Sequence, residues 1–332
     1  MLSPRKQIPD QISTALRQAT NILVATHVFP DADAIGSQLA LGKILESLGK
    51  KVFYYCDEFA SSMNKFMPGS EQLDNNLPDI SQFDAAVAVD CGDRFRLGHE
   101  VDTLLQIRPF IVIDHHAGHK EFGNIRWVEA GRSSTAEMIF DLALALDVEI
   151  SYNAAFNLYA GIVSDTGSFK YESTSAYTFY VAGQLLNLGV IPSEVAGKLY
   201  DNYSVGRLKL LEKVLGSLEL FSEGQIATIA VTNEMFEASG AKREDTEEFI
   251  SLPRALHSVK VAAFFKETLD GSVKVSLRAK GECDVSSVAM KFGGGGHRNA
   301  AGYSVKDKTL AEVNKELLQE LILRIESGYP AE

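Results

Sequence analysis

The sequence predicts an α/β protein with two domains. The first is built on a mostly parallel sheet flanked by helices, and the second is a smaller α/β unit. Two near-continuous apolar runs, 85–90 and 111–113, are typical of strands buried on both faces of a parallel sheet. Segments with helical periodicity lie between such runs, and a second set of strand-like segments begins at residue 225. With 332 residues, of which 45% are hydrophobic, the chain can bury two cores.

The first domain, residues 1–189, is expected to alternate helices and strands. Apolar residues at helical spacing predict helices at about 6–20, 34–48, 138–146, 153–163 and 176–188. Apolar runs predict strands at 22–25, 52–56, 85–90 and 111–113. Gly49 is typical of a residue that ends a helix, and Ser134–Glu137 has the pattern of a capping box. An alternative interpretation of Ser134–Glu137 places a hydroxyl near a substrate.

A helical link, residues 190–221, is expected to join this domain to the second, residues 222–332. A break at Gly189 and a favourable helix start at Pro192 mark the beginning of the link. In the second domain the pattern predicts strands at 226–231, 259–265 and 272–277, and helices at about 285–292 and 310–325.

Composition excludes several classes of protein. The net charge of −12, from 32 basic and 44 acidic residues, disfavours the capture of long nucleic acid. No apolar run approaches the ~20 residues that span a bilayer, so no membrane association is expected, and the N-terminus lacks the apolar stretch of a signal peptide. The three cysteines form no paired motif, which favours a cytoplasmic location. The sequence sets no oligomeric state, and a homodimer stays open.

Isolated polar residues stand at the ends of the predicted elements of the first domain. Three of them follow the first strand, where Pro30 prevents a helix from starting at once. The full set is His27, Asp31, Asp33, Asp90, His115, His116 and Asp165. Because ligands bind outside the carboxyl ends of the strands in parallel sheets, we expect these side chains to converge. For Asp31 and Asp33, the alternative is an ordinary acidic helix N-terminus.

This set of side chains indicates divalent metal ions. Carboxylates this close together repel unless a cation or a proton neutralises them. Carboxylate and imidazole ligands without thiolates suit Mn²⁺ better than a structural Zn²⁺ site. Four carboxylates call for about two dications, and two metals ~3.5–4 Å apart form the usual clamp for displacement at phosphorus.

A glycine run in the second domain is the other candidate site. Glycine lets backbone N–H groups approach an anion closely, and Arg278 at a strand end could add a bidentate phosphate contact. A bare glycine tract is usually a flexible linker, but this one lies inside a folded pattern. The residues expected to bind substrate here are Arg278, Gly294, Gly295, Gly296, His297 and Arg298.

Taken together, these motifs resemble the DHH phosphoesterase superfamily. The tripeptide Asp-His-His at 114–116 matches the one that names the superfamily. The stretch 27–37 resembles its first motif, Asp90 its second and the Asp-Thr-Gly at 165–167 its fourth. The stretch 293–302 resembles the DHHA1 domain that follows the catalytic domain. Size and two-domain layout are most similar to the NrnA-type nanoRNases of this superfamily.

The resemblance implies an enzyme that cleaves very short RNA to 5′-mononucleotides and also dephosphorylates 3′-phosphoadenosine 5′-phosphate. It implies two divalent ions, most suitably Mn²⁺, whose ligand sets share one carboxylate: His27, Asp31 and Asp90 for one ion, and Asp33, Asp90, His115 and Asp165 for the other. His116 would face the scissile phosphate, so the catalytic residues are Asp90 and His116. The glycine run and Arg278 would bind the rest of the nucleotide.

Two other interpretations stay open. A soluble relative that acts on cyclic di-AMP, or on its linear product pApA, would carry the same motifs. A catalytically silent nucleotide sensor would keep the fold, although a silent site is expected to lose some of its metal ligands.

Overall fold

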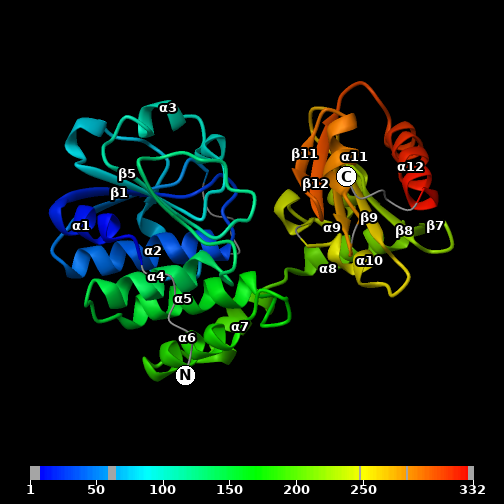
Figure 1. Ribbon diagram of the computed structural model, residues 1–332. Coiled ribbons are helices and arrows are strands. Elements are labelled where there is room, and N and C mark those ends of the chain that lie inside the picture. Colours follow the sequence, from blue (N-terminus) through cyan, green and yellow to red (C-terminus); the bar gives the residue numbers. More distant parts are fainter. Residues whose placement is uncertain (1–7, 59–64, 247, 282, 328–332) are drawn as a thin grey trace. The chain divides into compact units, whose positions relative to one another are not determined.

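The computed structural model describes residues 8–58, 65–246, 248–281 and 283–327. The chain divides into two compact units, Met1–Asn202 and Tyr203–Glu332, each with one sheet covered by helices (Figure 1). The boundary lies inside the stretch 190–221 that was expected to form a helical link. Helix α7 (Pro192–Tyr200) belongs to the first unit and helix α8 (Val205–Gly216) to the second.

The first unit contains a six-stranded sheet in which all neighbouring strands are parallel, as the apolar runs predict. The strands, in the spatial order β3-β2-β1-β4-β5-β6, are β3 (Leu73–Asp74), β2 (Lys51–Tyr55), β1 (Asn21–Ala25), β4 (Ala85–Val89), β5 (Phe110–Asp114) and β6 (Ile125–Val128). The direction in which the chain adds strands reverses between β1 and β4. In open α/β sheets, ligands bind at such a reversal, outside the carboxyl ends of the strands.

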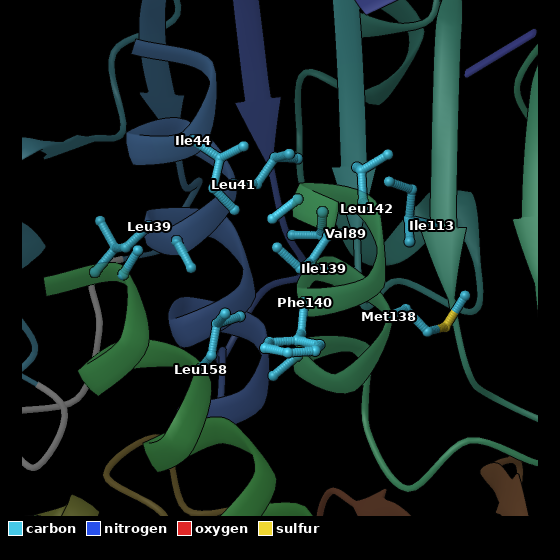
Figure 2. Close-up of a cluster of buried hydrophobic side chains, with 14 of the residues drawn as sticks. Leu39, Leu41, Ile44, Val89, Ile113, Met138, Ile139, Phe140, Leu142 and Leu158 are labelled. Carbon is cyan, nitrogen blue, oxygen red and sulfur yellow. The ribbon is translucent and has the colours of Figure 1, made fainter. Parts of the chain in front are cut away.

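Alternate residues of the central strands face two separate cores, as the pleat of a strand requires. Ile22 and Val24 of β1 belong to the core beneath the long helices, whereas Leu23 and Ala25 belong to the core on the opposite face. The helices that contribute to the larger core include α2 (Ala32–Ser47), α4 (Thr135–Ala145) and α5 (Tyr152–Asp165). Figure 2 shows part of this core, where side chains of all three helices gather against β4 and β5.

Helices α2 and α5 approach each other closely at two glycines. A Cβ atom on Gly36 would lie 2.4 Å from the carbonyl oxygen of Asn157, and one on Gly161 would lie 2.8 Å from Oδ1 of Asp33. No real side chain tolerates such contacts with backbone or with a buried carboxylate, so the helices pack at this distance only because both residues are glycine. The contact brings the N-terminus of α2 against α5, which ends at Asp165.

The remaining helices of the first unit are α1 (Asp10–Gln18), α3 (Val101–Leu104) and α6 (Ala176–Asn187). Short 3₁₀ helices are η2 (Ser70–Gln72), η3 (Ile80–Gln82), η4 (Arg94–Leu97) and, in the second unit, η5 (Arg243–Thr246). The expected helix at 6–20 is observed as α1, and residues 6 and 7 lie outside the described residues. Across the described ranges, no helix combines the length and the apolar character that a bilayer crossing requires.

The second unit contains a mixed six-stranded sheet, and among its described residues β8 and β9 are the only parallel neighbours. The strands, in spatial order, are β11 (Gly295–His297), β12 (Ala300–Val305), β10 (Val273–Ala279), β9 (Val261–Glu267), β8 (Ile226–Val231) and β7 (Glu219–Phe221). Its other helices are α9 (Asn233–Ser239), α10 (Ser251–Ala255), α11 (Val285–Lys291) and α12 (Leu310–Glu326). The fold class predicted from the sequence is confirmed, although the pattern did not predict β3, β6, β7, β11 or β12.

We predict that Gly36→Ala destabilises the first unit. The added methyl group would overlap the Asn157 carbonyl oxygen, and overpacking of this kind costs about 1–3 kcal/mol. In a unit of this size the melting temperature should fall by roughly 2–10 °C in a thermal scan. The matched control is Gly183→Ala in α6, where a Cβ meets nothing within 4 Å and alanine should be neutral or stabilising. Equal melting temperatures for Gly36→Ala and the wild type would contradict the packing argument.

Candidate active site

The polar residues predicted for the first unit converge at the carboxyl ends of β1, β4 and β5. They form three overlapping groups whose ligand-type atoms lie within 4.8 Å of one another: His27, Asp31 and Asp90; Asp33, His115 and Asp165; and Asp90, His115 and His116. This edge of the sheet is also where the strand order reverses between β1 and β4. The fold therefore places the whole set at the position where such sheets bind ligands.

Asp31, at the end of the loop between β1 and α2, is compatible with both interpretations of the acidic residues. Asp31 is the N-cap of α2, and its Oδ1 accepts hydrogen bonds from the N–H groups of Asp33 and Ala34, both at 3.0 Å. The ordinary capping role is therefore present. Asp31 remains exposed and also stands within the group formed with His27 and Asp90, so capping does not exclude a ligand role.

The imidazole of His27 has two alternative partners at one ring nitrogen. Its Nδ1 lies 2.8 Å from the carbonyl oxygen of Val28 and 2.9 Å from Nη2 of Arg96. If Nδ1 carries the proton and donates to Val28, Nε2 keeps a lone pair that faces Asp90, 3.7 Å from Oδ2. A cation at Nε2 selects this tautomer, because an imidazole nitrogen that binds a metal carries no proton.

Asp90 lies directly after β4 with a left-handed backbone, φ +55°. Few residues other than glycine adopt this conformation, and it is commoner at functional sites. Its N–H donates to the carbonyl oxygen of Ile113 at 3.0 Å, which ties the turn to β5. The hydroxyl of Thr135 donates to Oδ1 of Asp90 at 2.8 Å. The buried carboxylate is therefore held in orientation from two sides.

The group of Asp33, His115 and Asp165, called the second group below, adjoins Asp90 of the first group through His115. Nε2 of His115 lies 3.2 Å from Oδ2 of Asp165 and 3.9 Å from Oδ2 of Asp33. The same nitrogen lies 3.5 Å from Oδ1 of Asp90, whose other oxygen faces the first group. Nδ1 of His115 lies 3.3 Å from the carbonyl oxygen of Arg132, so a main-chain acceptor can again take the ring proton.

Asp33, in the first turn of α2, is fully buried, and its carboxylate faces the N-terminus of α4. Its Oδ2 accepts a hydrogen bond from the N–H of Thr135 at 2.7 Å, and its Oδ1 accepts one from the N–H of Ala136 at 2.9 Å. Unpaired N–H groups at a helix N-terminus stabilise a carboxylate, both directly and through the helix dipole. One helix end therefore supports two members of the cluster, since Thr135 also binds Asp90 through its side chain.

A buried ion network fixes the segment that precedes α4. The guanidinium of Arg132 lies 2.7 Å from Oε2 of Glu129 and 2.6 Å from Oδ2 of Asp141. Its Nη1 lies 3.3 Å from Oε1 of Glu137. Oγ of Ser134 accepts from the N–H of Glu137 at 3.1 Å, which confirms Ser134 as the N-cap of α4. The side chain of Glu137 accepts from Ser133 and Thr178. This segment also supplies the carbonyl oxygen of Arg132, which faces Nδ1 of His115.

Burial and neighbouring carboxylates raise the pKa values of Asp33 and Asp165. Burial, and then the charges of Asp90 and Asp165, raise the pKa of Asp33 well above its usual value. Burial, and then Asp31 and Asp90, raise the pKa of Asp165 to about 8. Burial would also raise the pKa of Asp90, but the neighbouring imidazoles outweigh it and lower that pKa. Protons must therefore neutralise part of the cluster unless cations do so, which is the behaviour of a cation site.

Asp114 is buried between two imidazoles. Its Oδ1 lies 2.7 Å from Nδ1 of His116, and its Oδ2 lies 2.7 Å from Nδ1 of His119. The hydrogen bond to Asp114 raises the pKa of His116 to about 9, so this ring carries a proton at neutral pH. His119, which the sequence pattern leaves without a role, stacks on Phe122 and holds the second oxygen of Asp114. Its only signal in the sequence is its spacing of three from His116.

In the second unit, the predicted glycine site forms a β-hairpin. Strand β11 pairs with β12, and Arg298 lies in the turn between them. A Cβ atom on Gly294 would lie 2.2 Å from the carbonyl oxygen of Gly302, and one on Gly296 would lie 2.5 Å from that of Ala300. Close packing of the hairpin therefore requires these two glycines, whether or not an anion binds there.

Part of the expected anion nest is already used within the fold. The N–H of Gly294 donates to the carbonyl oxygen of Ala289 at 2.9 Å, so it is not available to a phosphate. A Cβ on Gly295 would meet nothing within 4 Å, which leaves space for a ligand at that residue. The prediction for the side chain of His297 lies outside what the structure describes.

Arg278 lies next to this hairpin, because it pairs with Ala300 in the register of β10 and β12. It is partly buried, and both burial and the charge of Arg254 lower its pKa. Two guanidinium groups that disfavour each other's charge are stabilised by an anion between or beside them. An anion near Arg278 would therefore be favourable, and the predicted phosphate contact of this residue stays a prediction.

Comparisons with known proteins agree with the geometry. Residues 21–162 match the DHH family, N-terminal domain, and residues 225–327 match the DHHA1 domain. The bifunctional oligoribonuclease and PAP phosphatase NrnA of Thermus thermophilus is 31% identical over 299 residues, which cover 90% of this chain and 88% of that protein. A probable enzyme of the same description from Streptococcus mutans is 31% identical, with coverage of 93% and 96%. The crystal structure of an exopolyphosphatase-related protein from Bacteroides fragilis matches with a TM-score of 0.88 at 28% identity, covering 94% of this chain and 95% of that one.

The fold and the cluster define a class of hydrolase in which carboxylates and imidazoles that can hold a metal ion gather at the carboxyl edge of a parallel sheet. Within that class, the chain belongs to the DHH family of phosphoesterases, with a DHHA1 domain as its second unit.

We predict that Thr135→Val weakens binding of a divalent ion. Valine keeps the shape of the side chain but removes the hydroxyl that holds Oδ1 of Asp90. Loss of a hydrogen bond behind a metal ligand typically costs about 10- to 100-fold in affinity. Titration calorimetry with Mn²⁺ measures the change, and Thr135→Ser, which restores the donor, should bind nearly as the wild type does. If the valine and serine variants bound Mn²⁺ equally well, the hydroxyl would have no positioning role.

Proposed function

We propose that this phosphoesterase hydrolyses very short oligoribonucleotides to 5′-mononucleotides and also removes the 3′-phosphate of 3′-phosphoadenosine 5′-phosphate. The observation that carries the proposal is the position of Asp90, which is grouped with His27 and Asp31 and lies 3.5 Å from Nε2 of His115 in the neighbouring group. A carboxylate in this position can serve two metal ions at a site that acts on phosphate esters. The names of the relatives from Thermus thermophilus and Streptococcus mutans, both given as oligoribonuclease and PAP phosphatase, support the same substrates.

We propose that one divalent ion is held by His27, Asp31 and Asp90, which form one group in the structure, and the other by Asp33, Asp90, His115 and Asp165. Asp33, His115 and Asp165 form a group of their own, and Asp90 would complete this set because its Oδ1 lies 3.5 Å from Nε2 of His115. We propose Mn²⁺, because carboxylate and imidazole ligands without thiolates suit this ion. Bound ions would supply a polarised water and stabilise negative charge on the oxygens of the phosphorus centre. The protein's contribution is the fixed orientation of the ligands by Thr135 and by backbone donors and acceptors.

His116 is the group we propose to act on the phosphate itself. Asp114 holds Nδ1 of this ring at 2.7 Å and so fixes its orientation, and we propose that Nε2 is the atom that meets the substrate. With a pKa of about 9, the ring is charged at neutral pH and can stabilise a phosphate oxygen. The same Nε2 proton can be given to the leaving oxygen when the ester bond breaks. His119 keeps Asp114 in place during this step.

The second unit would supply a further contact to the nucleotide. Arg278 and Arg298 offer positive charge at the hairpin end of the sheet, and Gly295 leaves room there for a ligand. Such a contact favours substrates short enough to use it fully. A long strand gains little more from a chain with a net charge of −12.

We place the activity in the cytoplasm, because Cys56, Cys91 and Cys283 are all free thiols.

The experiment that tests the proposal is product analysis on a panel of substrates. The panel contains 5′-labelled RNA from dinucleotide to long oligomer, 3′-phosphoadenosine 5′-phosphate, cyclic di-AMP and pApA. Mononucleotides from the shortest RNA, and phosphate from 3′-phosphoadenosine 5′-phosphate, are the expected products. Preference for cyclic di-AMP or pApA would replace the proposed substrates, and binding without any product would indicate a nucleotide sensor.

We predict that activity requires a divalent ion and that Asp90→Ala is the most damaging single change at the site. Because we propose Asp90 as a ligand of both ions, its loss should lower kcat by roughly 1,000-fold or more. Chelation followed by dialysis should abolish turnover, and added Mn²⁺ should restore it. Asp79→Ala, which removes an exposed carboxylate from the same unit, serves as the control. Retention of a tenth of the wild-type rate by Asp90→Ala would reject the shared-ligand assignment.

We predict that the wild type prefers RNA of about two to five nucleotides and that Arg278→Ala erodes this preference, because remote contacts position the scissile bond. The measurement is kcat/KM against RNA length, together with metal content, which should not change. Lys274→Ala is the matched control, since it removes an exposed cation four residues earlier in the same strand. Equal rates on a dinucleotide and a long RNA in the wild type would overturn the length proposal. An unchanged profile in Arg278→Ala would exclude this residue from it.

A further inference from the structure

Two exposed aromatic residues belong to chain segments that adjoin His27 of the first ligand group and that the mechanism does not use. Phe29, in the loop after β1, is 74% exposed, and Phe95, in η4, is 65% exposed. The N–H of Val28 donates to the carbonyl oxygen of Arg96 at 2.7 Å, which joins this loop to η4. Each ring belongs to a residue next to one end of that hydrogen bond. The two rings therefore belong to one local structure, which we call the aromatic rim: Phe29, Phe95, Arg94 and Arg96.

The backbone at Phe29 is unusual as well. Its φ of +53° is left-handed, which is a clear outlier for a bulky residue that lacks the polar side chain of asparagine or aspartate. Such conformations persist only where the surrounding structure imposes them, and they concentrate at ligand sites. A single exposed aromatic ring on a protein surface needs no explanation. Two rings in joined segments, one of them on a strained backbone two residues from His27, are better explained by a ligand.

The cations of the aromatic rim suit a phosphate-bearing ligand. The guanidinium carbon of Arg94 lies 4.6 Å from the centroid of the Phe95 ring, and Nη2 of Arg96 lies 2.9 Å from Nδ1 of His27. When Nδ1 donates to Val28, it cannot accept from Arg96. The tautomer that prepares His27 for a cation therefore also leaves the Arg96 guanidinium available to a phosphate oxygen.

We propose that the aromatic rim is a nucleobase platform of the first unit. A base of the substrate stacks on Phe95, with Phe29 beside it, and Arg96 contacts the phosphate that is joined to that nucleotide. This inference rests on the proposed function, because it assigns a binding place for a base of the same short oligoribonucleotide. Every base has a π face, so a platform of this kind accepts any base and makes the enzyme tolerant of sequence.

The platform is tested with a dinucleotide whose linkage is a non-hydrolysable methylene phosphonate and in which 2-aminopurine replaces each base in turn. Stacking on an aromatic ring quenches 2-aminopurine fluorescence, so the wild type should quench one of the two probes strongly. Phe95→Ala should lose this quenching and should bind about 5- to 50-fold more weakly, the usual effect of removing one stacking ring. Phe95→Trp should keep the quenching and the affinity.

Kinetics with an abasic substrate separate stacking from a structural defect. Phe95→Ala should raise KM on a normal dinucleotide and leave unchanged the KM on a dinucleotide that is abasic at the stacked position. Mn²⁺ affinity should equal that of the wild type. Tyr152→Ala is the matched control, because this partly exposed ring lies at the opposite end of α5 from Asp165, roughly 20 Å away at the usual rise per residue. An equal loss on the normal and abasic substrates would overturn the platform.

The two proposals fail in different ways. If the wild type releases no product from a dinucleotide, the proposed function fails, and the fluorescence comparison still decides whether the platform exists. If the wild type cleaves dinucleotides but Phe95→Ala quenches and binds as the wild type does, the platform fails and the proposed function stands. The absence of quenching with both probes in the wild type would likewise reject the platform.

Discussion

Buried carboxylates held side by side are the constraint on which the first unit depends. Asp33 and Asp90 are almost completely removed from water. Together with Asp165, they all lie within 4 Å of Nε2 of His115. Such charges are tolerated only where donors and cations compensate them. Much of the nearby structure supplies that compensation. The N-terminus of α4 binds one carboxylate through its backbone and the other through the Thr135 hydroxyl.

The packing of helices α2 and α5 also positions the carboxylate cluster. Glycines at 36 and 161 let α2 and α5 meet at backbone distance, which brings the loop after β1 and the end of α5 to one place. The Arg132 network then fixes the segment in front of α4. Stability and function are coupled here, because loosening either contact would move carboxylates that must stay within a few ångströms of one another.

The sequence predicts this architecture well where a residue's chemistry is visible from its neighbours along the chain. Apolar runs identify β4 and β5, and an isolated Asp or His at the end of each run identifies most of the cluster. Strand β3 has two residues and β6 is only partly buried, so neither produces a pattern. The roles of Thr135 and His119 depend on partners 45 residues and five residues away, respectively. Only the fold shows that Gly294 and Gly296 serve strand pairing, because a glycine run has the same letters in a linker, a nest or a tight hairpin.

The imidazoles of His27 and His115 face acceptors of the main chain, the carbonyl oxygens of Val28 and Arg132, whereas His116 faces the side chain of Asp114. A carbonyl oxygen is present whatever residue occupies its position, so sequence drift at 28 or 132 does not by itself remove it. The carboxylate at 114 can be lost in one mutational step. The part of the site that orients ligands is therefore robust to divergence, and the part that sets the reactivity of the neighbouring imidazole is open to it. New specificities within such a scaffold would evolve more readily by changing the partner of His116 than by rebuilding the cluster.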